Sequence, residues 1–306
     1  MVLPPVPALM DTPATPALVV DLLLRIPYAY RRFSVTAENA RRTYGIDREL
    51  CRELAARGLP HLGEDPDALF DENDLATASL HLGLKSVRRF TMGFWLDSLA
   101  RLRHGATRYE VTVSATCPTP AHRGPCRYEV LAADGGRRTV TAERRTAAQV
   151  GRLAAEAAEA PYPVPSPLRG LVADFSDVDF CPLPFTLADD VDFLRTARIG
   201  TCPLLAAALV EAAWGRGFEA RTSYGLVVAA PYSQAHTWAE IRVAGRWVKV
   251  DPLMPRILRR TGLCDEEGWP PTLSPAGLYH RLGASGPLVS HAWAECGVSL
   301  ATAVVP

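Results

Sequence analysis

Apolar residues recur every three or four positions along the first third of the chain, which is the spacing of amphipathic helices. The pattern predicts helices over residues 36–44, 47–57, 71–82 and 86–103. Thr36 and Asp71 begin two of these segments as N-cap residues, and acidic residues follow in the first turns. Three glycines punctuate the helix ends: Gly45, Gly58 and Gly83. Residues 17–104 are therefore expected to form a helical region.

Between residues 105 and 145 the pattern changes to alternation, which predicts strands. The alternating segments are 109–113, 128–131 and 139–141, and Asp134-Gly135-Gly136 supplies a hairpin turn between the last two. The Ala-rich stretch over residues 146–160 predicts a helix. Residues 105–160 are therefore expected to form a small β region followed by a helix.

The proline-rich segment 161–167 interrupts the chain and is the expected boundary before a domain over residues 168–306. Beyond it, the patterns predict helices over 188–198 and from residue 202 to about 216. Strands are predicted over 219–228, 236–243 and 247–250. We expect an α+β fold, in which a C-terminal core of a helix packed on an antiparallel sheet follows the helical region and the small β hairpin region.

Composition excludes several classes of protein. Hydrophobic residues make up 48% and charged residues 22%, so the chain has enough apolar residues for a core. Lys+Arg and Asp+Glu both number 33, so no global field attracts the protein to nucleic acid or to an anionic membrane. No apolar run approaches the roughly 20 residues that span a bilayer. The proline-rich residues 1–16 lack the pattern of a signal peptide and are expected to be a flexible lead.

Seven cysteines are scattered along the chain, which is typical of free thiols in a reducing compartment rather than of a disulfide framework. We therefore expect a cytoplasmic protein. The basic residues are almost all arginine and alanine is abundant, which suggests a bacterial source with a GC-rich genome.

Cys202 begins a strongly apolar predicted helix, with Thr201 as its N-cap and Pro203 in its first turn. The positive end of a helix favours a thiolate over a thiol and can stabilise an oxyanion. A cysteine at a helix start is, taken alone, more often an inert core residue.

His236 begins a predicted strand, and Asp251 ends the next one after a turn at Ala244-Gly245. Each has an ordinary interpretation, as a strand histidine and as an Asp-Pro strand terminator. A hairpin would bring Asp251 near the start of the His236 strand. With Cys202, the three residues form a nucleophile, a base and an orienting carboxylate.

Four blocks of sequence carry a resemblance to a known family: Gly200-Thr201-Cys202, Arg216-Gly217-Phe218-Glu219-Ala220-Arg221, His236-Thr237-Trp238-Ala239-Glu240 and Trp247-Val248-Lys249-Val250-Asp251-Pro252. Over residues 190–256 the chain resembles the transglutaminase-like superfamily. The resemblance implies a papain-like Cys-His-Asp fold and chemistry through an acyl-thioester on the cysteine. The reactions that it implies are amide exchange, amide hydrolysis and amide-bond formation. The Arg-Gly-Gly-x-Cys block of the arylamine acetyltransferases is absent, and no oxyanion side chain is identified.

The resemblance implies an enzyme in which Cys202, His236 and Asp251 are catalytic. We expect it to take an acyl group from a peptide, amide or thioester donor and to pass that group to an amine in a biosynthetic pathway. A peptidase or amidase that transfers the group to water is the alternative. Three further residues are candidates for the substrate pocket: Thr201, Trp238 and Gln234. No cofactor is expected, because thiol, imidazole and carboxylate suffice for the chemistry.

Two other features of the sequence suggest different functions. Residues 44–59 and 69–75 resemble a helix-turn-helix of the MerR kind, which leaves open a non-catalytic binding or regulatory protein. Acidic residues dilute the arginines there, so a solvated helical face is favoured and no nucleic-acid partner is expected. Cys117, His122 and Cys126 lie within ten residues, but a structural zinc site needs four ligands. No metal is therefore expected, and His280 and His291 receive no role.

Overall fold

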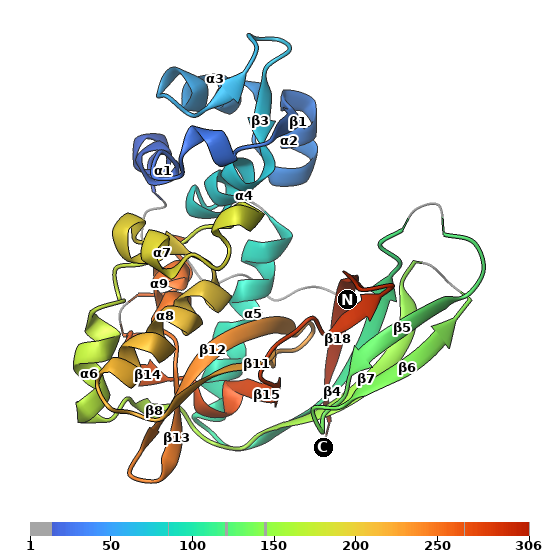
Figure 1. The fold of residues 1–306 in the computed structure, drawn as a ribbon, viewed down its shortest axis with the longest axis vertical. Helices are drawn as coiled ribbons and strands as arrows, with labels where there is room; N and C mark the ends of the chain where they lie inside the picture. Colours follow the sequence, from blue (N-terminus) through green and yellow to red (C-terminus); the bar gives the residue numbers. More distant parts are fainter. Residues whose placement is uncertain (1–13, 85, 120–121, 144–145, 266, 306) are drawn as a thin grey trace. The chain divides into compact units, whose positions relative to one another are not determined.

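The computed structural model describes residues 14–84, 86–119, 122–143, 146–265 and 267–305 of a mixed α+β protein (Figure 1). Most of the lead expected over residues 1–16 lies outside these residues. The chain divides into two compact units, each assembled from three separate segments. The first contains residues 1–93, 168–209 and 251–272, and the second contains residues 94–167, 210–250 and 273–306.

Helices dominate the N-terminal part of the first unit, as the sequence predicts. They are α1 (Pro16–Leu23), α2 (Ala37–Tyr44), α3 (Arg48–Ala56) and α4 (Glu72–His81). A small sheet accompanies them in the order β1-β3-β2, formed by β1 (Phe33–Thr36), β2 (His61–Leu62) and β3 (Leu69–Asp71). Both predicted N-caps are confirmed: Thr36 accepts the N–H of Asn39 at 3.3 Å, and Asp71 accepts that of Asn73 at 2.8 Å. The predicted helix over 86–103 is α5 (Val87–Leu102).

A buried ion pair between Arg31 and Asp74 connects the end of α1 to α4. Arg31 Nε donates to Asp74 at 2.6 Å, and its other nitrogens donate to the carbonyl oxygens of Ile26 at 2.6 Å and Leu23 at 2.7 Å. Both charged side chains are only 1% exposed. Because buried backbone carbonyls need partners, Arg31 terminates α1 and binds it to α4.

The remainder of the first unit contains Cys202 and the block of sequence around it. It comprises α6 (Ser166–Ala173), β9 (Asp179–Phe180), the 3-10 turn η2 (Phe185–Leu187), α7 (Val191–Ala197), β10 (Ile199–Gly200), the first half of α8 (Cys202–Gly215) and α9 (Leu253–Arg260). Strands β9 and β10 pair in parallel. The helix predicted over 188–198 begins later, at Val191, because Asp190 caps it by accepting the N–H of Phe193 at 2.8 Å.

Two antiparallel sheets form one part of the second unit (Figure 1). The first has the order β18-β4-β7 and consists of β4 (Thr107–Thr116), β7 (Ala148–Ala157) and β18 (Gly297–Val305). The second has the order β17-β16-β5-β6 and consists of β5 (Cys126–Leu131), β6 (Arg137–Ala142), β16 (Val289–His291) and β17 (Ala294–Glu295). The predicted strands and the hairpin turn at 134–136 are confirmed, since Leu131 pairs with Arg137.

The helix predicted over residues 146–160 is wrong. Residues 148–157 form β7, which pairs with β4 along most of its length. The buried positions Ala148, Val150, Leu153, Ala155 and Ala157 follow the strand alternation with one irregularity. Alanine's helix propensity amounts to only a fraction of 1 kcal/mol per residue, so the hydrogen bonds and burial offered by β4 override it.

A four-stranded antiparallel sheet forms the other part of the second unit, in the order β13-β12-β11-β15. Its strands are β11 (Ala220–Val227), β12 (Gln234–Val243), β13 (Arg246–Val250) and β15 (Tyr279–Gly283). Short pieces complete the unit: β8 (Tyr162–Pro163), β14 (Leu273–Ser274) and the 3-10 turn η3 (Ala276–Leu278). The three strands predicted after the Cys202 helix are thus confirmed, and with them the α+β class. Within the described residues, no helix combines the length and apolar character needed to cross a bilayer.

Candidate active site

Cys202 is the first residue of α8, as the sequence predicts. The carbonyl oxygen of Thr201 accepts the N–H of Leu205 at 3.0 Å, which starts the helical ladder, and Pro203 occupies the first turn, where it lacks an N–H that the helix would leave unbonded. Cys202 is partly exposed, whereas five of the other cysteines are buried. It therefore combines solvent access with the positive end of a helix, the setting of reactive thiols.

His236 lies in β12, and aromatic rings surround its imidazole. The ring of Tyr279 meets it edge-on with centroids 4.9 Å apart, and the ring of Trp238 is stacked at 6.1 Å. Trp238 and Tyr279 also contact each other at 5.0 Å. The residue is 6% exposed. These contacts pack the imidazole against two aromatic rings of the second unit.

Gly225 faces His236 across the β11–β12 pair. On its other side β11 approaches β15 so closely that a Cβ on Gly225 would overlap the carbonyl oxygen of His280. The pairing of these strands is irregular between Tyr224 and Gly225. Only glycine fits this position, because its neighbours are backbone atoms that cannot rotate away.

Two of the sequence blocks meet in a single ion pair. Arg221 of β11 pairs in register with Glu240 of β12, and its guanidinium binds the Glu240 carboxylate at 2.6 and 2.8 Å. The other carboxylate oxygen accepts the indole N–H of Trp238 at 3.3 Å. The Arg221 guanidinium also lies 4.0 Å from the ring centre of Trp247. In this network the arginine, the tryptophans and the glutamate fix the strand that carries His236.

Asp251 follows the last residue of β13 and is 5% exposed. Its Oδ1 accepts the N–H groups of Leu253 at 3.1 Å and Met254 at 3.3 Å, at the beginning of α9. Val250, the preceding residue, pairs with Ala239 of β12. The carboxylate is therefore oriented by the backbone of the helix that it precedes.

The three expected pocket residues differ in exposure. Thr201 and Gln234 are partly exposed, and Trp238 is 1% exposed. Gln234 is the first residue of β12, and its buried Oε1 has no hydrogen-bond partner among the described residues. The roles of these residues in binding stay predictions.

Lys249 was not singled out from the sequence. Its Nζ donates to the carbonyl oxygens of Ala276 and Tyr279, both at 2.7 Å, and burial lowers the pKa of its ammonium group. Since the Tyr279 ring contacts His236, Lys249 secures the segment that orients the imidazole. The signal in the sequence was a lysine inside an otherwise apolar strand, between Val248 and Val250.

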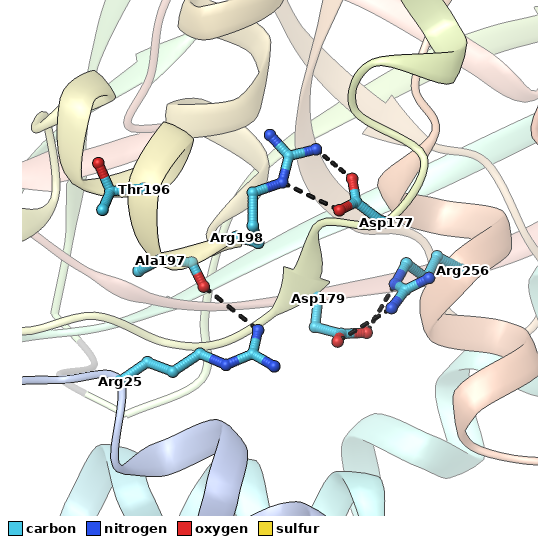
Figure 2. A pocket seen from close by; sticks show the side chains of 7 residues that line it. All are labelled: Arg25, Asp177, Asp179, Thr196, Ala197, Arg198 and Arg256. Atoms are coloured by element: carbon cyan, nitrogen blue, oxygen red, sulfur yellow. Dashed lines mark hydrogen bonds and ion pairs between the residues drawn. The ribbon is translucent and has the colours of Figure 1, made fainter.

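A polar recess of about 460 Å³ lies in the first unit (Figure 2). Arg256 binds Asp179 through two nitrogens at 2.6 and 3.0 Å, and Arg198 binds Asp177 in the same two-pronged manner. Arg25 donates to the carbonyl oxygen of Ala197 at 3.2 Å. Because these guanidinium groups are engaged with partners of the protein itself, we interpret the recess as an ion-pair network that joins β9, α7 and α9.

Four side chains in the described part of the chain could hold a metal ion: Cys117, His122, Cys126 and His291. The sequence had grouped the first three, and His291 joins them only in the folded chain. Outside the residues left undescribed, these are the only His, Cys, Asp or Glu side chains grouped closely enough for ligation.

No curated protein and no solved structure matches the chain. Residues 182–252 match the family model described as the transglutaminase-like superfamily. The match contains all four sequence blocks together with Cys202, His236 and Asp251. Over this segment the chain is confirmed as transglutaminase-like.

Proposed function

We propose that this protein is an enzyme that transfers an acyl group through a thioester on Cys202, with His236 as the base and Asp251 as the residue that orients the imidazole. The observation that carries the proposal is the state of Cys202, a partly exposed thiol on the first residue of a helix inside a transglutaminase-like segment. Members of this superfamily are usually cysteine enzymes.

The step begins when His236 accepts the thiol proton and the Cys202 sulfur attacks the carbonyl carbon of the donor. The carbonyl oxygen becomes an oxyanion, which the N–H groups at the start of α8 would stabilise. As the bond to the leaving group breaks, the imidazolium returns the proton to the departing amine or thiol. The product is the acyl-thioester and a neutral leaving group, so charge and protons balance.

The thioester is then attacked by an acceptor, whose proton again passes to His236. An amine acceptor gives an amide and restores the Cys202 thiol. Water would instead give a carboxylic acid, which is the peptidase or amidase alternative. We favour an amine, and the effect of an added amine on the product distinguishes the two acceptors.

Alkylation of the thiol tests the nucleophile. We expect iodoacetamide to modify Cys202 near neutral pH much faster than an ordinary thiol, whose pKa is about 8.5, because a thiolate is the reacting form. Changing His236 to Asn should slow the modification at least tenfold. Cys51→Ala is the matched control and should leave the rate of alkylation at Cys202 unchanged. Cys51 is buried, and burial raises the pKa of its thiol to about 11. Slow alkylation of Cys202, no faster than that of a denatured chain, would favour the non-catalytic alternative.

Intact mass spectrometry tests the acyl step. The chain is incubated with peptide amides and small-molecule thioesters, and an adduct that vanishes in Cys202→Ala is expected. Adding a primary amine should then divert product from acid to amide. If the yield of acid is unchanged by the added amine, the enzyme is a hydrolase. Turnover in Cys202→Ala would refute the proposal.

A further inference from the structure

We propose that Cys117, His122, Cys126 and His291 form a structural zinc site that joins the two β-sheets in one part of the second unit. Neither the expected acyl chemistry nor the family match involves these residues, because all four lie outside residues 182–252.

Strand pairing brings the four residues together. Cys117 follows the last residue of β4, Cys126 is the first residue of β5, and His122 lies in the loop between them. His291 ends β16, which pairs antiparallel with β5 so that His291 faces Tyr128. Because side chains two residues apart on a strand share one face, Cys126 and His291 are diagonal neighbours on the same side of the sheet.

The distances match tetrahedral coordination. All the ligand atoms lie within 4.8 Å of one another, and Cys126 Sγ is 3.3 Å from His122 Nδ1. In a tetrahedral zinc site with bonds of about 2.0 to 2.3 Å, neighbouring ligand atoms are about 3.3 to 3.8 Å apart. The cluster therefore needs only a contraction of about 1 Å at its widest pair to hold the ion.

A hydrogen bond prepares His291 as a ligand. Its Nδ1 lies 2.8 Å from the carbonyl oxygen of Arg127, which can only accept, so Nδ1 carries the proton and Nε2 has the lone pair. Metal-binding histidines usually donate their second N–H in this way, which fixes the ring and its tautomer. The His122 ring lies edge-on to His291, with centroids 4.8 Å apart.

The donor set selects zinc and a structural role. Two thiolates and two neutral imidazoles in a tetrahedron are a typical zinc environment, and four protein ligands leave no position for substrate. Cys126 is 0% exposed and His291 is 7% exposed. Two thiolates offset the charge of Zn²⁺, so the bound cluster is neutral, which burial favours.

The proposed ion would act as a clamp. Cys117 directly follows β4 of the β18-β4-β7 sheet, whereas Cys126 and His291 belong to the β17-β16-β5-β6 sheet. The ion also connects His291, near the C-terminal end of the sequence, to a loop in its first half. Because the ligands meet only in the folded unit, the free energy of binding adds to the free energy of folding.

The test is metal analysis of the full chain, purified from cells grown with zinc. We expect about one zinc ion per chain, and at least a tenfold weaker affinity after Cys117→Ala or His291→Ala. Cys296→Ala is the matched control. Cys296 is buried, and burial together with neighbouring Cys117 and Cys126 raises the pKa of its thiol to about 11, yet it is not one of the four ligands. It should retain the metal.

A second measurement avoids variants that fail to fold. The wild-type chain is stripped with a chelator and titrated with Co²⁺, which should give the intense visible bands of tetrahedral cobalt and a thiolate charge-transfer band. Zinc should then displace the cobalt and raise the melting temperature. The proposal is overturned if the chain carries no zinc and the cobalt spectrum is octahedral. It is equally overturned if peptide mapping of the purified protein finds a Cys117–Cys126 disulfide, or if Cys117→Ala and His291→Ala keep full zinc occupancy.

Discussion

Replacing Gly225 by alanine is the sharpest test of how the sheet supports His236. The added Cβ would overlap the carbonyl oxygen of His280 and would lie 2.9 Å from its carbonyl carbon and 3.0 Å from the Cα of Arg281. An ordinary carbon–oxygen contact is about 3.3 Å, so β15 must move away from β11 by about 1 Å or more. All the opposing atoms are backbone, so no side-chain rotation relieves the overlap.

The cost follows from the contacts that would be disturbed. Overpacking of this kind costs about 1 to 3 kcal/mol. The shift also strains the pairing of Gly225 with Arg281 and of Leu226 with His280, at about 0.5 to 1.5 kcal/mol for each hydrogen bond lost. We therefore expect Gly225→Ala to lower the free energy of unfolding by about 2 to 6 kcal/mol.

Urea denaturation followed by tryptophan fluorescence measures this loss. Gly93→Ala is the matched control, because a Cβ at Gly93 meets nothing within 4 Å and the residue lies inside α5. That variant should be as stable as the wild type or more stable by up to about 1 kcal/mol. Tyr279 moves with β15 and contacts His236. On the proposal that His236 is the base for Cys202, alkylation of Cys202 should therefore also slow in Gly225→Ala. A variant within about 0.5 kcal/mol of the wild type would refute the reasoning.

Three further predictions concern buried charge. Arg31→Met should cost about 3 to 5 kcal/mol in urea denaturation, because it leaves the carboxylate of Asp74 buried without its cation, and Arg31→Met with Asp74→Leu should recover part of the loss. Arg221→Met should cost about 2 kcal/mol, since Glu240 is buried but Arg221 is 39% exposed, and unchanged stability would contradict the proposed role of the pair. Burial lowers the pKa of His81 below its ordinary 6.5, so the stability it contributes is present above that pH and is lost as the pH falls through the depressed pKa. The free energy of unfolding should therefore decrease from about pH 7.5 to about pH 5, and less steeply in His81→Gln, in which the amide can replace the bond from Nε2 to the Phe180 carbonyl at 2.8 Å.

The sequence by itself determined most of the helices, the strands that follow Cys202 and the family of that segment. These features depend on local information. A cap such as Thr36 bonds three residues ahead, and the apolar spacing of a helix repeats within one or two turns. The four sequence blocks could also be identified from the sequence. Two of them contain Arg221 and Glu240, which must pair for the sheet to bury the carboxylate of Glu240.

Only the tertiary structure decided the features that depend on partners far along the chain. The Ala-rich segment 148–157 forms a strand because it pairs with β4, and no local sequence pattern predicts that pairing. Glycine is required at position 225 because the backbone of β15, more than fifty residues later in the chain, would overlap with any Cβ there. His291 joined Cys117, His122 and Cys126 because β16 pairs with β5. Local propensity reports on a few neighbouring residues, whereas the pairing of distant strands is set by the free energy of the whole packed unit.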